Sequence, residues 1–122
     1  MVMKYLDTYI LCEIALGNPK FKHYENEVFI INDLTLAEFY GVLARDASLS
    51  VAEQWLMKLK SSSTPVRLSS LLKAALFKNQ LKHRHLSFFD AIGYIYAQEQ
   101  GILFVTGDKE FKNLPGVEFV PK

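Results

Sequence analysis

Residues 86–111 read LSFFDAIGYIYAQEQGILFVTGDKEF, and this stretch decides the fold. Ser87 is placed to cap a helix over residues 88–100. The apolar run that follows, residues 102–106, shows no polar alternation and is typical of a strand whose two faces are both covered. Asp108 lies two residues beyond the end of that strand. A helix that leads into a buried strand ending at an acid predicts an α/β protein with a parallel sheet.

Similar runs occur along the rest of the chain, and helices separate them. We expect five strands, in chain order over residues 2–6, 28–31, 66–68, 102–106 and 117–120. Between them we expect helices over residues 8–16, 34–44, 51–59, 71–81 (capped by Ser69 or Ser70) and 88–100, with one helical turn over residues 109–112. This alternation predicts right-handed crossovers, helices on both faces of the sheet, and a single domain over residues 1–122.

Composition narrows the possible classes of function. Half of the 122 residues are apolar and 22% are charged, which excludes a disordered chain. A net charge of +1 argues against a protein that coats nucleic acid without specificity. Cys12 is the only cysteine, so an internal disulfide and a cysteine zinc site are excluded. No apolar run is long enough for a membrane span, and Asp7 interrupts any signal-peptide core, so we expect a cytoplasmic protein.

Four acids stand out by their positions. In open parallel sheets the working site lies at the carboxyl ends of the strands, and Asp7 and Asp108 each follow an expected strand. Glu38 and Asp90 lie near the starts of expected helices among apolar neighbours. Burying such a carboxylate without a partner costs several kcal/mol, so we expect each one to be paired or to be used in chemistry.

Each acid also has a simpler interpretation. Glu38 follows Thr35 at the spacing of a capping box, and Asp90 follows Ser87 in the same way. The two strand-end acids could be solvated loop residues. The combination favours a common site, because converging carboxylates are stable only with bound cations or protons. Hard oxygen ligands select Mg²⁺ or Mn²⁺, ions that support hydrolysis of phosphodiester bonds.

The same residues carry a family resemblance. LDTYILCEI at residues 6–14, LTLAEFYGVL at 34–43, the stretch at 86–111 and PGVEFV at 115–120 resemble the signature blocks of PIN-domain proteins. They are especially similar to the VapC-type toxin ribonucleases of toxin–antitoxin pairs. The resemblance implies a three-layer α/β/α fold with a five-stranded parallel sheet in the order 3-2-1-4-5.

The resemblance also implies a function. It implies a Mg²⁺- or Mn²⁺-dependent endoribonuclease that hydrolyses RNA phosphodiester bonds, with an antitoxin protein as partner. The acids implied as catalytic residues and metal ligands are Asp7, Glu38, Asp90 and Asp108. We also expect a homodimer, and we expect the helices around Phe39 and Trp55 to present an apolar groove that an antitoxin helix fills.

Several neighbours of the acids take expected roles from the resemblance. Thr106 matches a hydroxyl residue that would orient the last acid or a metal-bound water, and Thr8 matches the residue after the first acid. Tyr9 departs from the pattern, since the family most often has Asn there, which puts the local hydrogen bonding in doubt. Glu110 is either an assisting acid or an exposed glutamate.

Two other classes of protein compete with this interpretation. A response-regulator receiver domain needs an acid at the end of its third strand and an acidic pair after its first, and this chain has neither. A PIN-like module that only binds other proteins remains the alternative, although all four acids are present. The basic stretch over residues 78–85 is either an RNA contact or the solvated end of a helix. Gly93, inside an apolar helix, predicts close packing against another backbone, with the sheet or the Glu38 helix as its neighbour.

Overall fold

The sheet of this protein has five parallel strands in the order β3-β2-β1-β4-β5, as expected. The computed structural model describes residues 2–122 of the chain. The central strand β1 pairs with β2 on one side and with β4 on the other. The strands are β1 (Lys4–Leu6), β2 (Phe29–Asn32), β3 (Ser63–Thr64), β4 (Leu103–Thr106) and β5 (Val117–Phe119).

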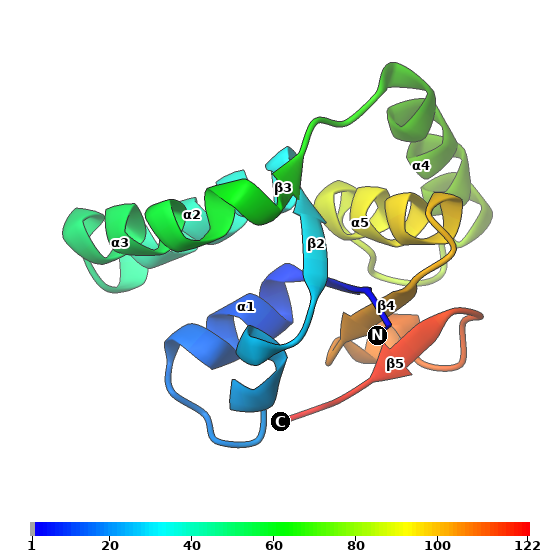
Figure 1. Cartoon of the computed structure of the whole chain (residues 1–122). Helices are drawn as coiled ribbons and strands as arrows, with labels where there is room; N and C mark the ends of the chain where they lie inside the picture. Colours follow the sequence, from blue (N-terminus) through cyan, green and yellow to red (C-terminus); the bar gives the residue numbers. More distant parts are fainter. Residues whose placement is uncertain (1) are drawn as a thin grey trace.

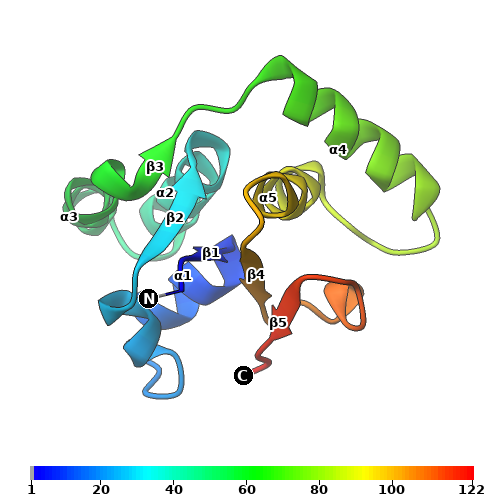
Figure 2. The same ribbon diagram turned by 45° about the vertical axis from the view of Figure 1, so that its right-hand side comes forward.

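Helices cover both faces of this sheet, which gives three layers (Figures 1 and 2). On one face α5 packs over β4, β1 and β2, and on the other α1 packs over β1 and β4. Further out, α3 packs on α2 and α4 packs on α5. The helices are α1 (Thr8–Ala15), η1 (Lys22–Asn26), α2 (Asp33–Asp46), α3 (Leu49–Leu59), η2 (Lys60–Ser62), α4 (Leu68–Gln80), α5 (Phe88–Glu99) and η3 (Lys109–Phe111).

Aromatic side chains fill the core between α5 and the sheet. Tyr5 of β1 and Phe104 of β4 lie with their ring centroids 5.6 Å apart, and both are fully buried. Gly93 of α5 lies directly above them, since a Cβ there would come within 3.1 Å of each ring. The close packing with the sheet expected at Gly93 is therefore confirmed, although not with another backbone. Its neighbours are side chains of the sheet, and their bulk lets α5 approach only where it carries no side chain of its own.

The third strand does not lie where the sequence predicted it. Residues 66–68 were expected to form it, but β3 is Ser63–Thr64, which pairs with Ile31 and Asn32. Pro65 has no N–H to donate, so the ladder ends before it. The next helix also begins earlier than expected.

That helix is α4, and its cap differs from the prediction. Its N-cap is Arg67, without a side-chain hydrogen bond, and it starts at Leu68. Ser69 and Ser70 therefore lie inside its first turn and do not cap it. Ser70 instead donates a hydrogen bond to Glu99 at 2.6 Å, which joins α4 to α5.

One of the two predicted capping boxes is wrong, and this frees Glu38. Asn32 caps α2, because its Oδ1 accepts a hydrogen bond from the backbone N of Thr35 at 2.9 Å. The Thr35 hydroxyl is 2.7 Å from the Tyr5 hydroxyl and forms a buried hydrogen bond with it. Glu38 therefore lies beyond the cap, in the body of α2. The other cap is confirmed, since Ser87 Oγ accepts from the backbone N of Asp90 at 3.0 Å.

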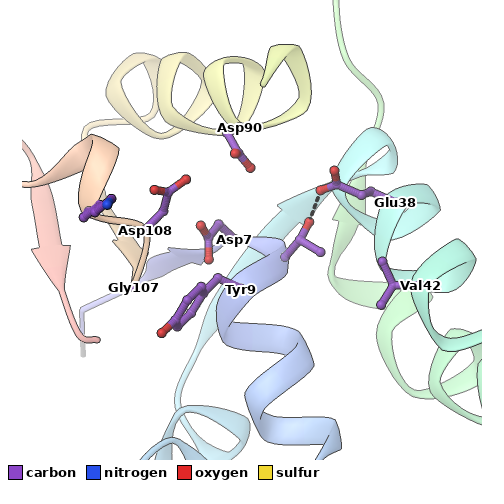
Figure 3. A pocket seen from close by; sticks show the side chains of 9 residues that line it. Asp7, Tyr9, Glu38, Val42, Asp90, Gly107 and Asp108 are labelled. Carbon is purple, nitrogen blue, oxygen red and sulfur yellow. Dashed lines mark hydrogen bonds between the residues drawn. The ribbon is translucent and has the colours of Figure 1, made fainter. Parts of the chain in front are cut away.

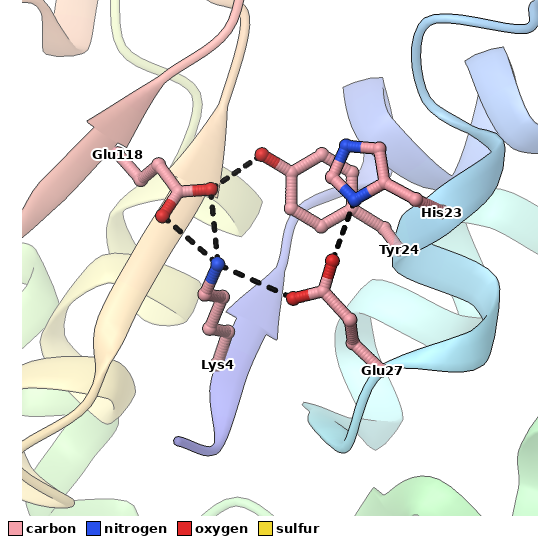
Figure 4. A network of polar contacts seen from close by, with 5 residues as sticks. All are labelled: Lys4, His23, Tyr24, Glu27 and Glu118. Atoms are coloured by element: carbon pink, nitrogen blue, oxygen red, sulfur yellow. Dashed lines mark hydrogen bonds and ion pairs between the residues drawn. The ribbon is translucent and has the colours of Figure 1, made fainter. Parts of the chain in front are cut away.

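A cluster of charged and polar side chains, which we call the Lys4 cluster, joins β1 to η1 and β5 (Figure 4). Lys4 Nζ lies 3.3 Å from Glu27 Oε1 and 3.1 Å from Glu118 Oε1. Tyr24 donates a hydrogen bond to Glu118, and His23 Nδ1 lies 2.6 Å from Glu27. Every charge in this cluster has a partner of opposite sign or a hydrogen bond.

The helices of the described residues are all too short or too polar to cross a lipid bilayer.

Candidate active site

A cleft of about 470 Å³ opens at the carboxyl edge of the sheet, and all four predicted acids line it (Figure 3). They come from four places in the fold: Asp7 from the end of β1, Glu38 from α2, Asp90 from α5 and Asp108 from the turn after β4. The structure thus brings together residues that are spread over most of the chain. The cleft is lined by Asp7, Thr8, Tyr9, Glu38, Val42, Asp90, Gly107, Asp108 and Lys109.

Asp7 lies deepest in this cleft, with only 3% of its surface exposed. It is also the N-cap of α1, because its Oδ1 accepts a hydrogen bond from the backbone N of Ile10 at 3.1 Å. Its other oxygen, Oδ2, accepts a hydrogen bond from the Thr106 hydroxyl at 2.5 Å. Strand pairing between β1 and β4 brings these two residues together. Both carboxylate oxygens are therefore fixed in direction, each with a lone pair remaining.

Thr106 contacts both strand-end acids. It was predicted to orient the last acid or a metal-bound water, and its hydroxyl also donates to Asp7, the first acid. The same hydroxyl oxygen accepts a hydrogen bond from the backbone N of Asp108 at 3.0 Å. Thr106 therefore links the two strand-end acids, one through its side chain and the other through its backbone.

Glu38 and Asp90 face the cleft from the helices on either side (Figure 3). Glu38 Oε1 accepts a hydrogen bond from the Thr8 hydroxyl, which joins α2 to the first turn of α1. Asp90 lies in the first turn of α5, where its backbone N donates to the Ser87 cap. Ser87 thus fixes the helix start, and the Asp90 carboxylate is directed into the cleft.

Asp108 and Glu110 hold the turn that closes the cleft. Asp108 caps η3, with its Oδ1 accepting from the backbone N of Glu110 at 2.9 Å. The Glu110 side chain accepts from the backbone N of His85 at 2.9 Å, and Arg84 donates to the Glu110 carbonyl at 2.5 Å. Glu110 does not line the cleft, so we assign it to loop structure. Arg84, from the basic stretch, is likewise engaged in holding this turn.

The charges in the cleft are not compensated. Within residues 2–122 none of the four acids forms an ion pair with a Lys, Arg or His. Burial raises the pKa of Asp7 well above its ordinary value; the Thr106 hydrogen bond opposes this, and the charge of Asp90 adds to it. Burial likewise raises the pKa of Asp90 to about 6, opposed by a hydrogen bond with Ser87 and supported by the charges of Glu38 and Asp108. The cleft therefore attracts protons or cations.

The donor set fits a hard divalent cation. The ligand atoms on offer are carboxylate oxygens, which Mg²⁺ and Mn²⁺ prefer. Across the described part of the chain, no three His, Cys, Asp or Glu side chains stand close enough together to form a complete metal cage. Mg²⁺ commonly retains several waters and takes only one or two carboxylates together with substrate phosphates, so an open arrangement suits it.

Sequence reasoning missed three residues that line the cleft: Val42, Gly107 and Lys109. Lys109 follows Asp108 and is the one cation among the lining residues of this cleft. Its position in the chain, directly after a strand-end acid, was a signal that could have identified it. Val42 lies one helical turn after Glu38, on the same face of α2, and periodicity could have identified it too.

Comparison with solved structures finds the same fold in several proteins. VapC20 from Mycobacterium tuberculosis, described as a toxin that cleaves the sarcin–ricin loop, is 18% identical with a TM-score of 0.80, covering 98% of this chain and 99% of its own. A toxin–antitoxin complex from Klebsiella pneumoniae is 20% identical with a TM-score of 0.76, covering 94% and 95%. The DNA-bound VapBC of Salmonella typhimurium is 17% identical with a TM-score of 0.76, covering 99% and 98%.

At these identities the structural similarities describe the fold alone. A search of curated proteins found no match. The family assignment comes from the sequence, where the model of the PIN domain matches residues 4–117, nearly the whole chain. All four acids that line the cleft fall inside that match. On this evidence the chain belongs to the PIN-domain family.

Proposed function

We propose that this protein is a metal-dependent endoribonuclease and acts as the toxin of a toxin–antitoxin pair. The observation that carries the proposal is the cleft itself, which four carboxylates from distant parts of a PIN-domain chain line without forming an ion pair within the described residues. Placing like charges together costs stability, so such an arrangement is expected where a ligand supplies the missing positive charge.

Neighbouring side chains suit the four acids to a role in metal binding. Asp7, Glu38, Asp90 and Asp108 would hold Mg²⁺ or Mn²⁺, which when bound supplies positive charge to phosphate oxygens and activates water for attack. Thr106 fixes the Asp7 carboxylate, and Thr8 fixes that of Glu38. Lys109, at the rim, adds a positive charge that suits an RNA phosphate.

The expected substrate is single-stranded RNA or an RNA loop. The cleft is open to solvent along one side of the sheet edge, which suits a flexible strand better than a rigid duplex. A structural neighbour, VapC20, is described as cleaving a loop. We therefore expect the nucleotides on both sides of the cleaved bond to be unpaired.

A cleavage assay tests this function. A labelled RNA hairpin with a long loop is incubated with purified protein in Mg²⁺, in Mn²⁺ and in excess EDTA, with Asp7→Asn as a matched control against contaminating nucleases. We expect cleavage in the loop only with metal and only with the unaltered protein. Cleavage that survives EDTA, or equal cleavage by Asp7→Asn, would contradict the proposal.

The partner prediction needs one correction before it is proposed. The helices around Phe39 and Trp55 were expected to present an apolar groove, but Phe39 is 1% exposed and packs edge-on against Trp55, with ring centroids 6.0 Å apart. The large apolar side chains that α3 does expose are Leu49 and Met57, at 60% and 65%. We propose that an antitoxin helix binds along α3 over these residues, supported by the neighbours described as toxin–antitoxin complexes.

The proposed homodimer has a different surface. Leu68, Leu72 and Leu76 recur every four residues along α4 and are 68%, 58% and 62% exposed. Such a stripe on an outer helix can pair with its own copy about a twofold axis. Light scattering should then give a dimer, and Leu72→Glu should give a monomer that keeps its circular dichroism spectrum. A monomeric unaltered protein would contradict this part of the proposal.

The alternative function is a PIN-like module that binds a protein without cleaving RNA. It predicts that the antitoxin-type partner binds while no RNA is cleaved with either metal. The uncompensated carboxylates favour the nuclease, because a binding module has no need to hold them together.

A further inference from the structure

Tyr9 lines the cleft and packs directly on the backbone of Gly107 (Figure 3). A Cβ at Gly107 would lie 2.0 Å from Cε1 of the Tyr9 ring, 2.4 Å from Cζ and 2.6 Å from Cδ1. Separations this short are not possible between carbon atoms that are not bonded. Gly107 does not have the positive φ that favours glycine, so space alone explains it.

The Tyr9 ring cannot easily move aside, because it is held on two other sides. The ring of Phe21, which is fully buried, meets it edge-on with centroids 6.3 Å apart. The Tyr9 hydroxyl accepts a hydrogen bond from the backbone N of Lys122 at 3.0 Å. Lys20 Nζ in turn donates to the carbonyl of Pro121, which holds that segment in place. These contacts hold the Tyr9 ring against Gly107.

The Tyr9 ring supports the backbone at Gly107, which joins Thr106 to the cleft residue Asp108. Gly107 lies between Thr106, which donates a hydrogen bond to Asp7, and Asp108, whose backbone N returns a hydrogen bond to Thr106. Asp7 and Tyr9 both belong to the start of α1, since Asp7 is its cap. One short helical segment thus holds the β4 turn twice, by the carboxylate of Asp7 and by the ring of Tyr9.

We infer that Tyr9 is a positioning residue, whose ring, seated on Gly107, holds Asp108 at its place opposite Asp7 and so sets the metal affinity of the cleft. The inference rests on the proposed function for its consequence, metal binding, but not for its structural part. The contact with Gly107 is made by the ring, so Tyr9→Phe keeps it: the variant loses the hydrogen bond from Lys122 but keeps the edge-on packing on Phe21. The glycine acts through its missing side chain, so Gly107→Ala should conflict with the ring only while the ring is present.

The test is a double-mutant cycle with Tyr9→Ala, Gly107→Ala and the two combined, alongside Tyr9→Phe. Gly41→Ala is the glycine control, because a Cβ at Gly41 meets nothing within 4 Å. The first readout, in EDTA, is the amide resonance of Asp108 in ¹⁵N-edited NMR spectra. The second is Mn²⁺ affinity by isothermal titration calorimetry.

We expect Tyr9→Ala and Gly107→Ala each to shift the Asp108 amide and to weaken Mn²⁺ binding about tenfold. Tyr9→Phe and Gly41→Ala should stay within about twofold of the unaltered protein. In the Tyr9→Ala background, Gly107→Ala should weaken binding by less than about twofold, because the ring that it would strike is gone.

Three results would overturn the inference. The first is an Asp108 amide unchanged by Tyr9→Ala, which would mean that the ring does not hold the turn. The second is a shifted amide with unchanged Mn²⁺ affinity, which would mean that the turn does not set the site. The third is an equal effect of Gly107→Ala with and without the ring. If the unaltered protein neither binds Mn²⁺ nor cleaves RNA, the proposed function fails, while the amide resonance still decides whether Tyr9 holds the turn.

Discussion

The two ends of β1 handle charge in opposite ways. At its start, Lys4 lies between Glu27 and Glu118, and each carboxylate in the Lys4 cluster has a cation or a hydroxyl beside it (Figure 4). Just past its end, Asp7 lies with three other acids and no ion pair (Figure 3). The hydrogen bonds that Asp7 accepts come from neutral donors, Thr106 and a backbone amide.

The pKa shifts record this difference. Although burial works against it, hydrogen bonds and charges from Glu118 and Glu27 raise the pKa of Lys4, and its ammonium ion is stabilised. Burial raises the pKa of Asp7, so there the charged form is destabilised. One end of the strand is arranged for stability of the fold. The other retains unfavourable charge that a bound cation or a proton would relieve, which is typical of a functional site.

The largest expected effect comes from a substitution at the carboxyl end of β1. Asp7→Asn should lower the rate of RNA cleavage about 100-fold or more, because it removes the charge of a proposed metal ligand. Asparagine caps helices as well as aspartate does, so α1 should remain folded. The matched control is Glu118→Gln in the Lys4 cluster, which should leave the rate of cleavage nearly unchanged. A similar loss in both variants would mean that the effect is one of folding.

The second effect is a gain in stability, whereas most substitutions in a protein core lower stability. The folded-state pKa of Asp90 is about 6 against an ordinary value of 3.8, so the folded protein binds more protons than the unfolded chain between these values. The contribution of Asp90 to the stability of the metal-free protein is therefore greatest below about pH 4 and is lost as pH rises through about 6. Asp90→Asn should remove this loss and raise the free energy of unfolding by about 2 kcal/mol at pH 7.

Urea unfolding in EDTA at pH 4 and at pH 7 measures this stabilisation. The difference between Asp90→Asn and the unaltered protein should be present at pH 7 and nearly absent at pH 4. The control at the other end is Glu27→Gln, which should lower stability at pH 7, since His23 and Lys4 lower the pKa of Glu27. A destabilised Asp90→Asn would show that Asp90 serves chiefly in the cap with Ser87.

A smaller effect concerns the neutral donors. Thr106→Val keeps the shape of a fully buried side chain but removes the hydroxyl that donates to Asp7. We expect Mn²⁺ affinity, measured by calorimetry, to fall about tenfold. Tyr24→Phe removes a comparable hydroxyl donor from Glu118 in the Lys4 cluster and should not change that affinity. Equal affinities in Thr106→Val and the unaltered protein would mean that Asp7 needs no orienting donor.

The smallest expected effect comes from a substitution at the amino end of β1, in the Lys4 cluster. Lys4→Met leaves Glu27 and Glu118 without their shared cation, and the free energy of unfolding should fall by about 1 kcal/mol, because the cluster is partly exposed. Adding Glu118→Gln should recover part of this loss. Urea unfolding at low and high salt gives the measurement. If Lys4 stabilises the protein only through the packing of its methylene groups, Glu118→Gln will recover none of the lost stability.

The sequence was a good guide to the elements whose patterns are local. Buried strands such as β4 are continuous apolar runs, and the Ser87 cap is written in adjacent residues. The four acids could be found because strand ends in a parallel sheet share one edge. The topology of the fold then brings Glu38 and Asp90, which lie on helices, over the same edge.

Other features depended on tertiary contacts that no local pattern contains. The β3 strand is only two residues long and is defined by its pairing with β2, so the apolar run after Pro65 was misleading. Asn32 displaced Thr35 as the cap of α2 because Tyr5, from another strand, engages the threonine hydroxyl. Thr106 reaches Asp7 across the sheet, a direction that spacing along the chain does not reveal.

The hydrogen bond between Thr106 and Asp7 also has a consequence for how the molecule is made. It joins residues 99 positions apart, and the central β1–β4 pairing has the same long range. Closing a loop of that length costs on the order of 4 kcal/mol of chain entropy before any contact is gained. Folding that depends on such pairings is slow, and β4 is the fourth of the five strands to be made when the chain is synthesised from its N-terminus. A nascent chain that has not yet reached β4 therefore carries its acids unassembled, and the cleft arises only after Asp108 has been made.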